Sequence, residues 1–260
     1  MTGVGERQFV DVRRDGAVCI LTLARERKLN ALSTAVEAQL KEALEQDEVR
    51  TSSAVVLAGR GRAFSAGADL AELAERTPEA ILAYYAATGD VYERVASLPQ
   101  PTLTAIHGFC LGAGLELALA TDFRIADESA VLGFPEVELG IVPSSGGTQR
   151  AARILGPARA KEVVLLRPRI SAAEASALGL VTEVVAEGTA LSRALELAQR
   201  LAAQPRLAAS VAKQAIDASS ESPREVGLLI ERLAYAMLAQ TEDARNAEPR
   251  FGSGGPAASD

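Results

Sequence analysis

The sequence predicts an α/β fold, with strand–turn–helix units in the first two-thirds of the chain and helices in the last third. Short apolar runs typical of buried strands are followed by glycine-rich turns and then by segments with helical spacing. From about residue 158 onward the periodicity is mostly helical. A chain of 260 residues is long enough to bury the core of one large domain with an appended region.

The expected strands begin with a hairpin near the N-terminus. Two apolar runs are separated there by Asp15 and Gly16, a pair typical of a tight turn between antiparallel strands. Later strands are short apolar runs bounded by glycine, proline or polar residues. The strands are expected at residues 8–13, 16–24, 53–58, 102–107, 122–127 and 130–134.

The expected helices are marked by capping residues and by proline. Ser33 and Ser171 each precede a segment with helical spacing, at the position from which a serine side chain caps a helix. Pro99 and Pro101 end a long helix predicted over residues 78–97. Other helices are expected from about residue 68, from about residue 148, and over residues 189–202, 206–218 and 222–240.

The chain shows no fixed-period repeat and no linker that would split it into independent domains. We therefore expect one main domain over residues 1–200, followed by a helical region over residues 201–251. The tail, residues 252–260, is low in sequence complexity and is predicted to be disordered.

Composition and charge argue against several classes of protein. The net charge of −7 disfavours a nucleic acid or an anionic membrane as the main partner. No apolar run is long enough for a transmembrane helix, and none resembles a signal peptide, so we expect a cytoplasmic protein. Cys19 and Cys110 lie in apolar surroundings without metal-ligand spacing, and we expect them to be buried, reduced thiols.

The stretch from Gly108 to Asp122 contains the first candidate site. A turn of small residues at Gly112, Ala113 and Gly114 leads into an apolar helical segment with one carboxylate, Glu116. An ionised glutamate is costly to bury, so natural sequences seldom place one there for packing. Backbone N–H groups at a helix start lack acceptors and favour negative charge. This stretch can therefore hold a base beside an electron-rich oxygen.

A second glycine-rich turn, residues 59–70, also joins a strand to a helix. It lacks the Gly-Lys-Ser/Thr of a phosphate-binding P-loop. The first stretch lacks the third glycine of a dinucleotide fingerprint, because Leu117 stands where that glycine would fall. A single glycine usually does no more than permit a tight turn. Two such junctions, however, can direct backbone N–H groups at one oxygen and stabilise the charge that it gains.

Other polar residues near these turns leave the choice of catalytic group open. Glu136 and Glu138 lie in a loop or extended segment, where both would face the same way. His107 is the only histidine; it ends a predicted strand, and we expect a structural imidazole there rather than a general base.

Several motifs resemble the enoyl-CoA hydratase/isomerase (crotonase) superfamily. The two signature segments are Phe64–Leu70 and His107–Asp122, and further similarity lies at residues 29–32, 133–136 and 139–150. The resemblance stays in register from about residue 8 to about residue 217. It implies a spiral of ββα units with a C-terminal helical trimerisation region, and assembly as a homotrimer or hexamer.

The resemblance also implies a reaction. The backbone N–H groups of Ala68 and Ala113 would form an oxyanion hole for a thioester carbonyl, and Glu116 and Glu136 match the two glutamates of the hydratases. The implied activity adds water to a trans-2-enoyl-CoA to give a 3-hydroxyacyl-CoA, with Glu116 as the base and Glu136 as the acid. Because a close pair of carboxylates titrates jointly, the two can share the proton transfers.

The same resemblance implies a binding site for coenzyme A, which is part of the substrate; no cofactor and no metal are implied. Ala66 would offer its carbonyl to the adenine, and the basic residues from Arg25 to Lys28 would lie near the phosphates. The implied contact residues are Arg27, Lys28, Leu29, Ala66, Ala68, Asp69, Leu70, Gly112 and Ala113.

The chain departs from the family pattern at three places. Ala71 stands where hydratases often carry a lysine, Glu26 replaces the usual proline after Arg25, and the segment after Asp243 differs from the family's ending. The alternatives are another acyl-CoA reaction on this scaffold, such as enoyl-CoA isomerisation or 3-methylglutaconyl-CoA hydration, and a non-catalytic protein that binds acyl-CoA or RNA. The acidic charge disfavours RNA, and the two retained glutamates favour catalysis.

Overall fold

The computed structural model of the protein describes residues 8–73 and 77–252. The chain forms two compact units, Met1–Ala202 and Ala203–Asp260. The first unit contains all the strands described, and the second is made of helices. Within the described residues, no helix combines the length and the apolar character needed to cross a membrane.

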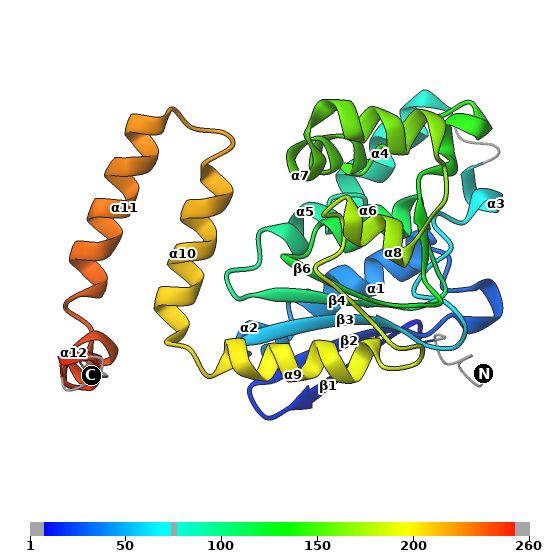
Figure 1. Ribbon diagram of the computed structural model, residues 1–260. Coiled ribbons are helices and arrows are strands. Elements are labelled where there is room, and N and C mark those ends of the chain that lie inside the picture. Colours follow the sequence, from blue (N-terminus) through cyan, green and yellow to red (C-terminus); the bar gives the residue numbers. More distant parts are fainter. Residues whose placement is uncertain (1–7, 74–76, 253–260) are drawn as a thin grey trace, which may run out of the picture. The chain divides into compact units, whose positions relative to one another are not determined.

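The main unit is built on a six-stranded sheet with the order β1-β2-β3-β4-β6-β9 (Figure 1). β1 and β2 form the predicted antiparallel hairpin, and every other neighbouring pair in this sheet is parallel. Parallel neighbours require crossover connections, which here contain the helices and loops that form the site. The strands are β1 (Val10–Asp15), β2 (Val18–Leu23), β3 (Ala54–Gly59), β4 (Thr102–Ile106), β6 (Phe123–Asp127) and β9 (Glu183–Val185).

Different helices cover the two faces of this sheet (Figure 1). On one face, the small residues Ala190, Ala194 and Ala198 of α9 (Ala190–Ala202) are buried against strand residues that include Val56. The larger core lies on the other face, where α1 (Thr34–Leu44), α5 (Val91–Ala96) and α6 (Ala113–Leu119) pack. Because strand side chains alternate between faces, Ile20 belongs to the first core and its neighbours Cys19 and Leu21 to the second.

A second, three-stranded sheet carries part of the site. Its strands are β5 (Phe109–Leu111), β7 (Val131–Gly133) and β8 (Ile170–Ser171), in the order β5-β7-β8. Ser65, in the loop after β3, lies beside β5: its N–H donates to the Phe109 carbonyl at 2.9 Å, and its carbonyl accepts from the Leu111 N–H at 3.1 Å. The two predicted glycine-rich junctions are therefore neighbours, although more than forty residues separate them in the sequence.

Along the sequence, most helices of the main unit follow one strand and precede the next. They are η1 (Glu26–Lys28), α1 (Thr34–Leu44), α2 (Asp47–Arg50), α3 (Leu70–Leu73), α4 (Pro78–Ala87), α5 (Val91–Ala96), α6 (Ala113–Leu119), η2 (Pro135–Leu139), α7 (Gly147–Lys161), the π-helical η3 (Glu162–Leu166), α8 (Ala172–Ala177) and α9. Within α7 the backbone breaks at Gly156, whose φ is 76°.

The predicted caps are confirmed. The Ser33 hydroxyl accepts from the Val36 N–H at 3.3 Å and caps α1. Ser171 and Glu174 form a capping box at the start of α8. In both cases a side-chain oxygen satisfies an N–H group that has no acceptor inside the helix.

The single helix predicted over residues 78–97 is wrong. The structure has two helices there, α4 and α5, separated by residues 88–90. Gly89 lies so close to Tyr85 that an added Cβ would stand 2.7 Å from its ring, so only glycine fits this approach. The N–H groups of Thr88 and Gly89 both donate to the Tyr84 carbonyl, which closes α4.

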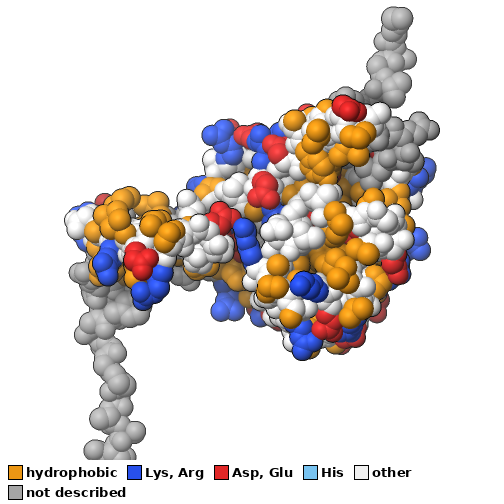
Figure 2. All heavy atoms as spheres, turned by 90° about the horizontal axis from the view of Figure 1, so that it is seen from above, with side chains coloured by type: hydrophobic (Ala, Val, Ile, Leu, Met, Phe, Trp, Pro, Cys, Tyr) orange, Lys and Arg blue, Asp and Glu red, His pale blue; other side chains and the backbone are white. Residues whose placement is uncertain are grey.

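The C-terminal unit consists of α10 (Arg206–Ala218), α11 (Arg224–Leu238) and α12 (Glu242–Gly252). Neither α10 nor α11 contains a buried residue, and both expose large apolar side chains. Figure 2 shows exposed apolar side chains on this unit among charged ones. Of the tail predicted to be disordered, Gly252 ends α12, and residues 253–260 lie outside the described residues.

Candidate active site

Glu116 lies in the first turn of α6, and its position depends on the glycine before that helix. Gly112 is the N-cap, with φ 51° and ψ −124°, a conformation that residues with a Cβ rarely adopt. The turn allows the chain to leave β5 and to start α6 immediately. Glu116 is 2% exposed and is surrounded by core residues of this helix.

The carboxylate of Glu116 is held by the loop before α7. Its Oε1 accepts from the N–H groups of Ser145 at 2.7 Å and Gly147 at 2.8 Å. Arg150 holds this loop, since its guanidinium donates to the Ser145 carbonyl at 2.8 Å and pairs with Glu93. A Cβ on residue 147 would stand 2.8 Å from Glu116 Oε1, so only glycine leaves room for the carboxylate.

These contacts counteract the effect of burial on Glu116. Burial raises the pKa of its carboxyl above the ordinary value, while the N–H groups of Gly147 and Ser145 and the charge of Arg150 lower it. Such hydrogen bonds stabilise the charged form of a carboxyl group. Glu116 therefore has the partners that a buried base needs to remain ionised.

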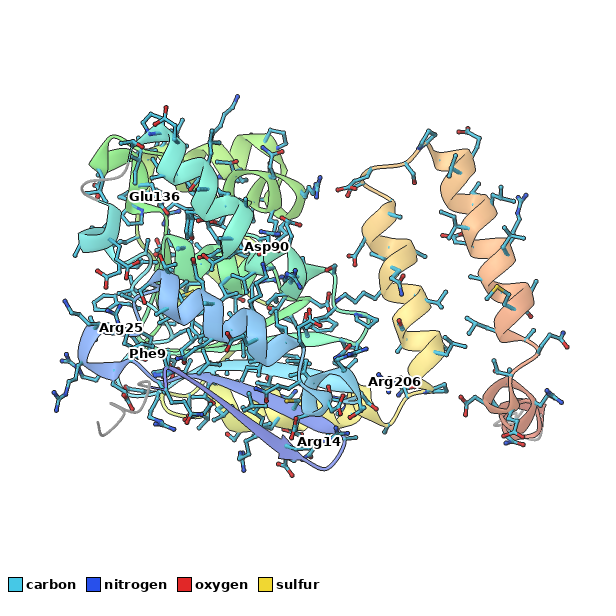
Figure 3. The ribbon with its side chains drawn as sticks, turned by 180° about the vertical axis from the view of Figure 1, so that it is seen from behind. Phe9, Arg14, Arg25, Asp90, Glu136 and Arg206 are labelled. Carbon is cyan, nitrogen blue, oxygen red and sulfur yellow. The ribbon has the colours of Figure 1, made fainter. Side chains whose placement is uncertain are left out.

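Glu136 lies on η2 and approaches the same glycine from another direction. A Cβ on residue 112 would stand 2.8 Å from Glu136 Oε1, so the carboxyl group lies directly over the Gly112 backbone. Glu136 is 9% exposed, and its Oε2 has no hydrogen-bond partner among the described residues. Figure 3 labels this side chain within the main unit. The Gly112 turn thus brings the two predicted glutamates to one place.

The environment of Glu136 favours its protonated form. Burial raises the pKa of this carboxyl to about 7; its own backbone N–H lowers it in part, and the charge of Glu116 raises it further. A carboxyl oxygen without a donor has nothing to stabilise its charge. Of the two carboxyls, Glu136 is the one whose contacts suit a proton donor.

The expectation of a loop or extended segment at Pro135–Gly140 is wrong. Pro135–Leu139 forms the 3-10 helix η2, in which residues two apart do not share a face. Glu136 is consequently buried, whereas Glu138 is exposed. Local backbone geometry therefore separates the two carboxylates that sequence reasoning alone could not distinguish.

The loop that carries Ala68 lies against the start of α6. Gly67, with φ 102°, approaches β5 so closely that a Cβ there would stand 2.9 Å from the Leu111 carbonyl oxygen and 3.7 Å from Ala113 N. The first residue of a helix has no acceptor within it. Neither the Ala68 nor the Ala113 N–H donates a hydrogen bond to another described group. The structure thus places, in neighbouring turns, two N–H groups that have no acceptor in the part of the chain that it describes.

Asn30, which the sequence analysis did not single out, holds this loop in place. Its side-chain NH₂ donates to the carbonyls of Arg60 at 2.9 Å and Ala63 at 2.8 Å, and its backbone carbonyl accepts from the Ser65 hydroxyl. Asn30 and the preceding Leu29 have φ of 54° and 49°. Asparagine tolerates this left-handed conformation better than most residues do, which is the one local signal for its role.

The residues expected to contact coenzyme A lie around this loop. Arg27 and Lys28 are exposed on η1, and Leu70 is 53% exposed at the start of α3. The Leu29 carbonyl accepts from the Ala66 N–H at 2.9 Å. The structure thereby brings the basic turn and the Ala66 loop together.

Asp69 is paired with a cation of the same basic segment. Its Oδ2 lies 2.7 Å from Arg25 Nη1, and this hydrogen bond lowers the pKa of the carboxyl below its ordinary value. The Arg25 guanidinium also lies over the ring of Phe9, 5.7 Å from the centroid (Figure 3). Arg25 thus fastens Asp69 and its loop to the N-terminal hairpin.

His107 and the two cysteines lie where they contribute to packing and hydrogen bonding. Nε2 of His107 lies 3.0 Å from the Gly61 carbonyl oxygen, in the turn after β3. Cys19 and Cys110 are buried and free, as predicted, and burial raises the pKa of the Cys19 thiol to about 11. Among the described residues, no group of three or more His, Cys, Asp or Glu side chains is arranged to hold a metal ion.

The arrangement has a defined chemical capability. Two backbone donors in neighbouring turns can stabilise negative charge on one oxygen. Two buried carboxyls, one that accepts two backbone hydrogen bonds and one whose pKa is raised to about 7, can remove and deliver protons beside it.

Comparisons with known proteins agree with this geometry. The model of a family described as enoyl-CoA hydratase/isomerase matches residues 13–252. The 2,3-dehydroadipyl-CoA hydratase of Escherichia coli K12 is 41% identical over 233 residues, which cover 89% of this chain and 91% of that protein. The short-chain-enoyl-CoA hydratase of Clostridium acetobutylicum is 33% identical over 250 residues, covering 95% of both chains.

Solved structures show the same fold. The crystal structure of the enoyl-CoA hydratase from Bacillus anthracis superposes with a TM-score of 0.88 at 39% identity, covering 94% of this chain and 96% of that one. The predicted crotonase-like α/β architecture, with helices at the C-terminus, is thereby confirmed.

Proposed function

This chain belongs to the enoyl-CoA hydratase/isomerase family, and we propose that it adds water across the C2–C3 double bond of a trans-2-enoyl-CoA to give a 3-hydroxyacyl-CoA. The observation that carries the proposal is the pair Glu116 and Glu136. Glu136 lies over Gly112, the N-cap of the helix that carries Glu116, beside two backbone N–H groups that have no acceptor among the described residues. A pair of carboxyls suits a reaction that must both activate water and protonate carbon.

The proposed reaction begins at the thioester carbonyl. Its oxygen would accept from the N–H groups of Ala68 and Ala113, which draw electron density away from C3. As the water oxygen attacks C3, negative charge grows on the carbonyl oxygen, where fixed donors stabilise it most. Loss of one such donor typically costs about 2.7–4 kcal/mol of transition-state stabilisation.

The two glutamates would divide the proton transfers. Glu116, whose Oε1 accepts hydrogen bonds from the Ser145 and Gly147 N–H groups, would accept the proton that the water loses. Glu136, with a pKa raised to about 7, delivers its proton to C2. The proton on Glu116 then returns to Glu136 before the next turnover. Only water is added, so the reaction calls for no redox cofactor.

The coenzyme A portion would follow the turn between β2 and α1. Arg27 and Lys28 are exposed there and suit its phosphates, and the Ala66 carbonyl suits the adenine amino group. Leu29, Asp69, Leu70 and Gly112 complete the proposed contacts. Arg25 is engaged with Asp69, so the phosphates depend on the two residues after Glu26.

Turnover of crotonyl-CoA, followed as loss of enoyl absorbance, tests the proposal. Glu116→Gln and Glu136→Gln should each lower kcat by at least about a hundredfold while the dissociation constant of coenzyme A stays within about threefold. Full activity in either variant would contradict the assigned roles. Exchange of the double bond between the C2–C3 and C3–C4 positions, without hydration, would instead identify an isomerase.

We also propose that the protein assembles as a homotrimer or hexamer through its C-terminal helices. Large apolar side chains are exposed on α10 and α11, among them Leu207, Ile216, Leu229, Leu233 and Met237. Such a surface is typical of subunit contacts. Light scattering after gel filtration should give the mass of three or six chains, and Leu229→Glu with Leu233→Glu should lower it.

A further inference from the structure

A buried serine, Ser65, joins the two turns that carry the proposed donors. It is 0% exposed and takes no part in the proposed proton transfers. Its backbone N–H and carbonyl bond to Phe109 and Leu111, so the residue is fixed beside β5, the strand that leads into α6. Any residue can make these backbone bonds, so they do not account for a hydroxyl group at this position.

The Ser65 hydroxyl fixes the turn that leads to Ala68. It donates to the Asn30 carbonyl at 2.8 Å and accepts from the Gly67 N–H at 3.2 Å. Both contacts are buried, and a buried polar group that loses its partner destabilises the fold. With both contacts in place, one hydroxyl group ties the segment before α1 to the Gly67 turn.

The direction of the Ala68 N–H follows from the peptide group to which it belongs. The carbonyl of that peptide, on Gly67, accepts from the Leu32 N–H at 2.8 Å. In a trans peptide such as this one, the carbonyl and the N–H point in opposite directions. The Ala68 N–H therefore points away from Leu32. Because Asn30 holds Ser65 and Leu32 holds Gly67, the segment 30–32 and Ser65 together set this direction.

Ser65 also touches the other turn. An added Cβ on Gly114 would stand 2.8 Å from the Cβ and the carbonyl oxygen of Ser65. Gly114 directly follows Ala113, the residue that carries the second proposed donor. The lack of a side chain at residue 114 thus lets α6 start against Ser65. One residue therefore contacts both turns, through hydrogen bonds on the Ala68 side and through close packing on the Ala113 side.

We propose that Ser65 is a positioning residue that fixes the two proposed donors, the N–H groups of Ala68 and Ala113, relative to each other. This inference rests on the proposed function, in which both donors bind one thioester oxygen. Fixed donors stabilise charge on that oxygen without having to reorganise during the reaction. A displacement of about 1 Å can lower a rate by about a hundredfold, so the spacing of the two turns matters for turnover.

Ser65→Ala tests the hydroxyl group, because it removes both side-chain hydrogen bonds and keeps the backbone pairing with β5. We expect kcat with crotonyl-CoA to fall by about tenfold to a hundredfold. The dissociation constant of coenzyme A should stay within about threefold of the wild-type value, since the donors act on the thioester.

Ser52→Ala is the matched control. Ser52 is also 0% exposed, donates to the Val49 carbonyl at 2.7 Å and accepts from the Gln100 side chain at 3.4 Å. It precedes β3, whereas Ser65 follows that strand. Chemical denaturation should show a loss of stability in both variants, but Ser52→Ala should keep kcat within about threefold. Equal losses of kcat in the two variants would overturn the inference, because Ser65 would then act through stability alone.

Gly114→Ala tests the packing side. The added methyl group removes no hydrogen bond of Ser65, and alanine favours a helix more than glycine does. It forces the start of α6 away from Ser65, however, because the methyl group meets the backbone of that residue. We expect kcat to fall by at least about tenfold. Wild-type kcat in Gly114→Ala would overturn the inference that the spacing of the two turns matters.

Infrared spectroscopy follows the donors without turnover. The ligand is butanoyl-CoA, isotopically labelled at its thioester carbonyl, which has no double bond to hydrate. Donors aimed at the carbonyl oxygen draw electron density from the C=O bond and lower its stretching frequency. The frequency should be lower in the wild-type complex than for the ligand in water. It should move back toward the value in water in Ser65→Ala and Gly114→Ala, but not in Ser52→Ala.

This measurement separates the inference from the proposed reaction. A frequency shift that is lost in Ser65→Ala supports the inference even if no enoyl-CoA is hydrated. A shift that Ser65→Ala retains in full overturns it even if the protein hydrates crotonyl-CoA. A wild-type frequency equal to that in water would contradict the two donors themselves, and with them both the inference and the proposed oxyanion hole.

Discussion

The carboxyl group of Glu136 lies over the backbone of Gly112, so close that a Cβ at residue 112 would stand 2.8 Å from Oε1. This contact joins the acid of the proposed reaction to the turn that presents the Ala113 N–H and starts the helix of Glu116. One residue without a side chain therefore sets the relation between an acid, a base and a donor.

Gly112→Ala should disrupt this relation. The added methyl group meets Glu136, and the φ of 51° disfavours any residue with a Cβ. We expect kcat with crotonyl-CoA to fall by about a hundredfold, the effect of a displacement of about 1 Å in an active site. Gly16→Ala is the control, since Gly16 has φ 58° but nothing within 4 Å of an added Cβ. Equal activity losses in the two variants would refute the steric explanation.

The raised pKa of Glu136, about 7, makes the stability of the protein depend on pH. A carboxyl that binds its proton more tightly when folded stabilises the fold below its unfolded pKa, and this contribution is lost as pH rises through the folded pKa. Glu136→Gln removes the cost of ionising the buried group. As the pH rises from 5 to 8, the free energy of unfolding of the variant should increase by about 1–3 kcal/mol relative to that of the wild type.

Thermal unfolding at the two pH values measures this gain. Glu138→Gln is the control, because Glu138 is an exposed neighbour on the same helical turn and its replacement should give no such gain. If the stability changes by the same amount between pH 5 and pH 8 in Glu136→Gln and in wild type, then ionisation of Glu136 carries no energetic cost in the folded protein.

Arg150 is a positioning residue for Glu116, because it holds the Ser145 carbonyl and its charge lowers the pKa of the Glu116 carboxyl. Arg150→Met removes both effects. We expect kcat to fall by about tenfold to a hundredfold. The acidic limb of the kcat/KM profile should move to higher pH, since the base is then harder to ionise.

Two further variants show whether charge or the loop contact matters. Arg150→Lys retains a positive charge, so it should restore the pH profile more than it restores kcat. Glu93→Gln removes the exposed partner of the ion pair with Arg150. An exposed ion pair contributes at most about 1 kcal/mol, so activity should be nearly unchanged. An acidic limb that stays in place in Arg150→Met would contradict the electrostatic role.

Asn30 should be needed for both stability and the oxyanion donor. Asn30→Ala leaves the carbonyls of Arg60 and Ala63 without their donor and places alanine at φ 54°. Each unsatisfied buried group costs about 1–3 kcal/mol. Asn30→Gly loses the same hydrogen bonds but tolerates this φ, so it should be about 1 kcal/mol more stable than Asn30→Ala. Chemical denaturation measures the difference.

Both Asn30 variants should also lose activity with crotonyl-CoA, because the loop that presents Ala68 is no longer held. If Asn30→Gly is stable at the assay temperature and retains full kcat, the Ala68 N–H does not depend on this side chain.

The local elements of this protein could be predicted from short stretches of sequence. Serine caps at Ser33 and Ser171, the hairpin turn at Gly16 and the helix after Gly112 each depend on neighbouring residues, whose energetics repeat from protein to protein. Prediction failed where the spacing of apolar residues does not record the backbone geometry. The break between α4 and α5 depends on how closely Gly89 approaches Tyr85 in the preceding turn, and a helical pattern does not reveal this.

The sequence by itself determined that a site would lie at two glycine-rich turns and at a glutamate in an apolar helical segment, and its motifs indicated the family. Only the tertiary structure decided which groups meet. It buried Glu136 and exposed Glu138 through one 3-10 turn, brought Glu136 over Gly112, and packed Ser65 against Gly114. The physical reason is that the burial of a charge, and with it a pKa, depends on segments far apart in the chain, which no local pattern records.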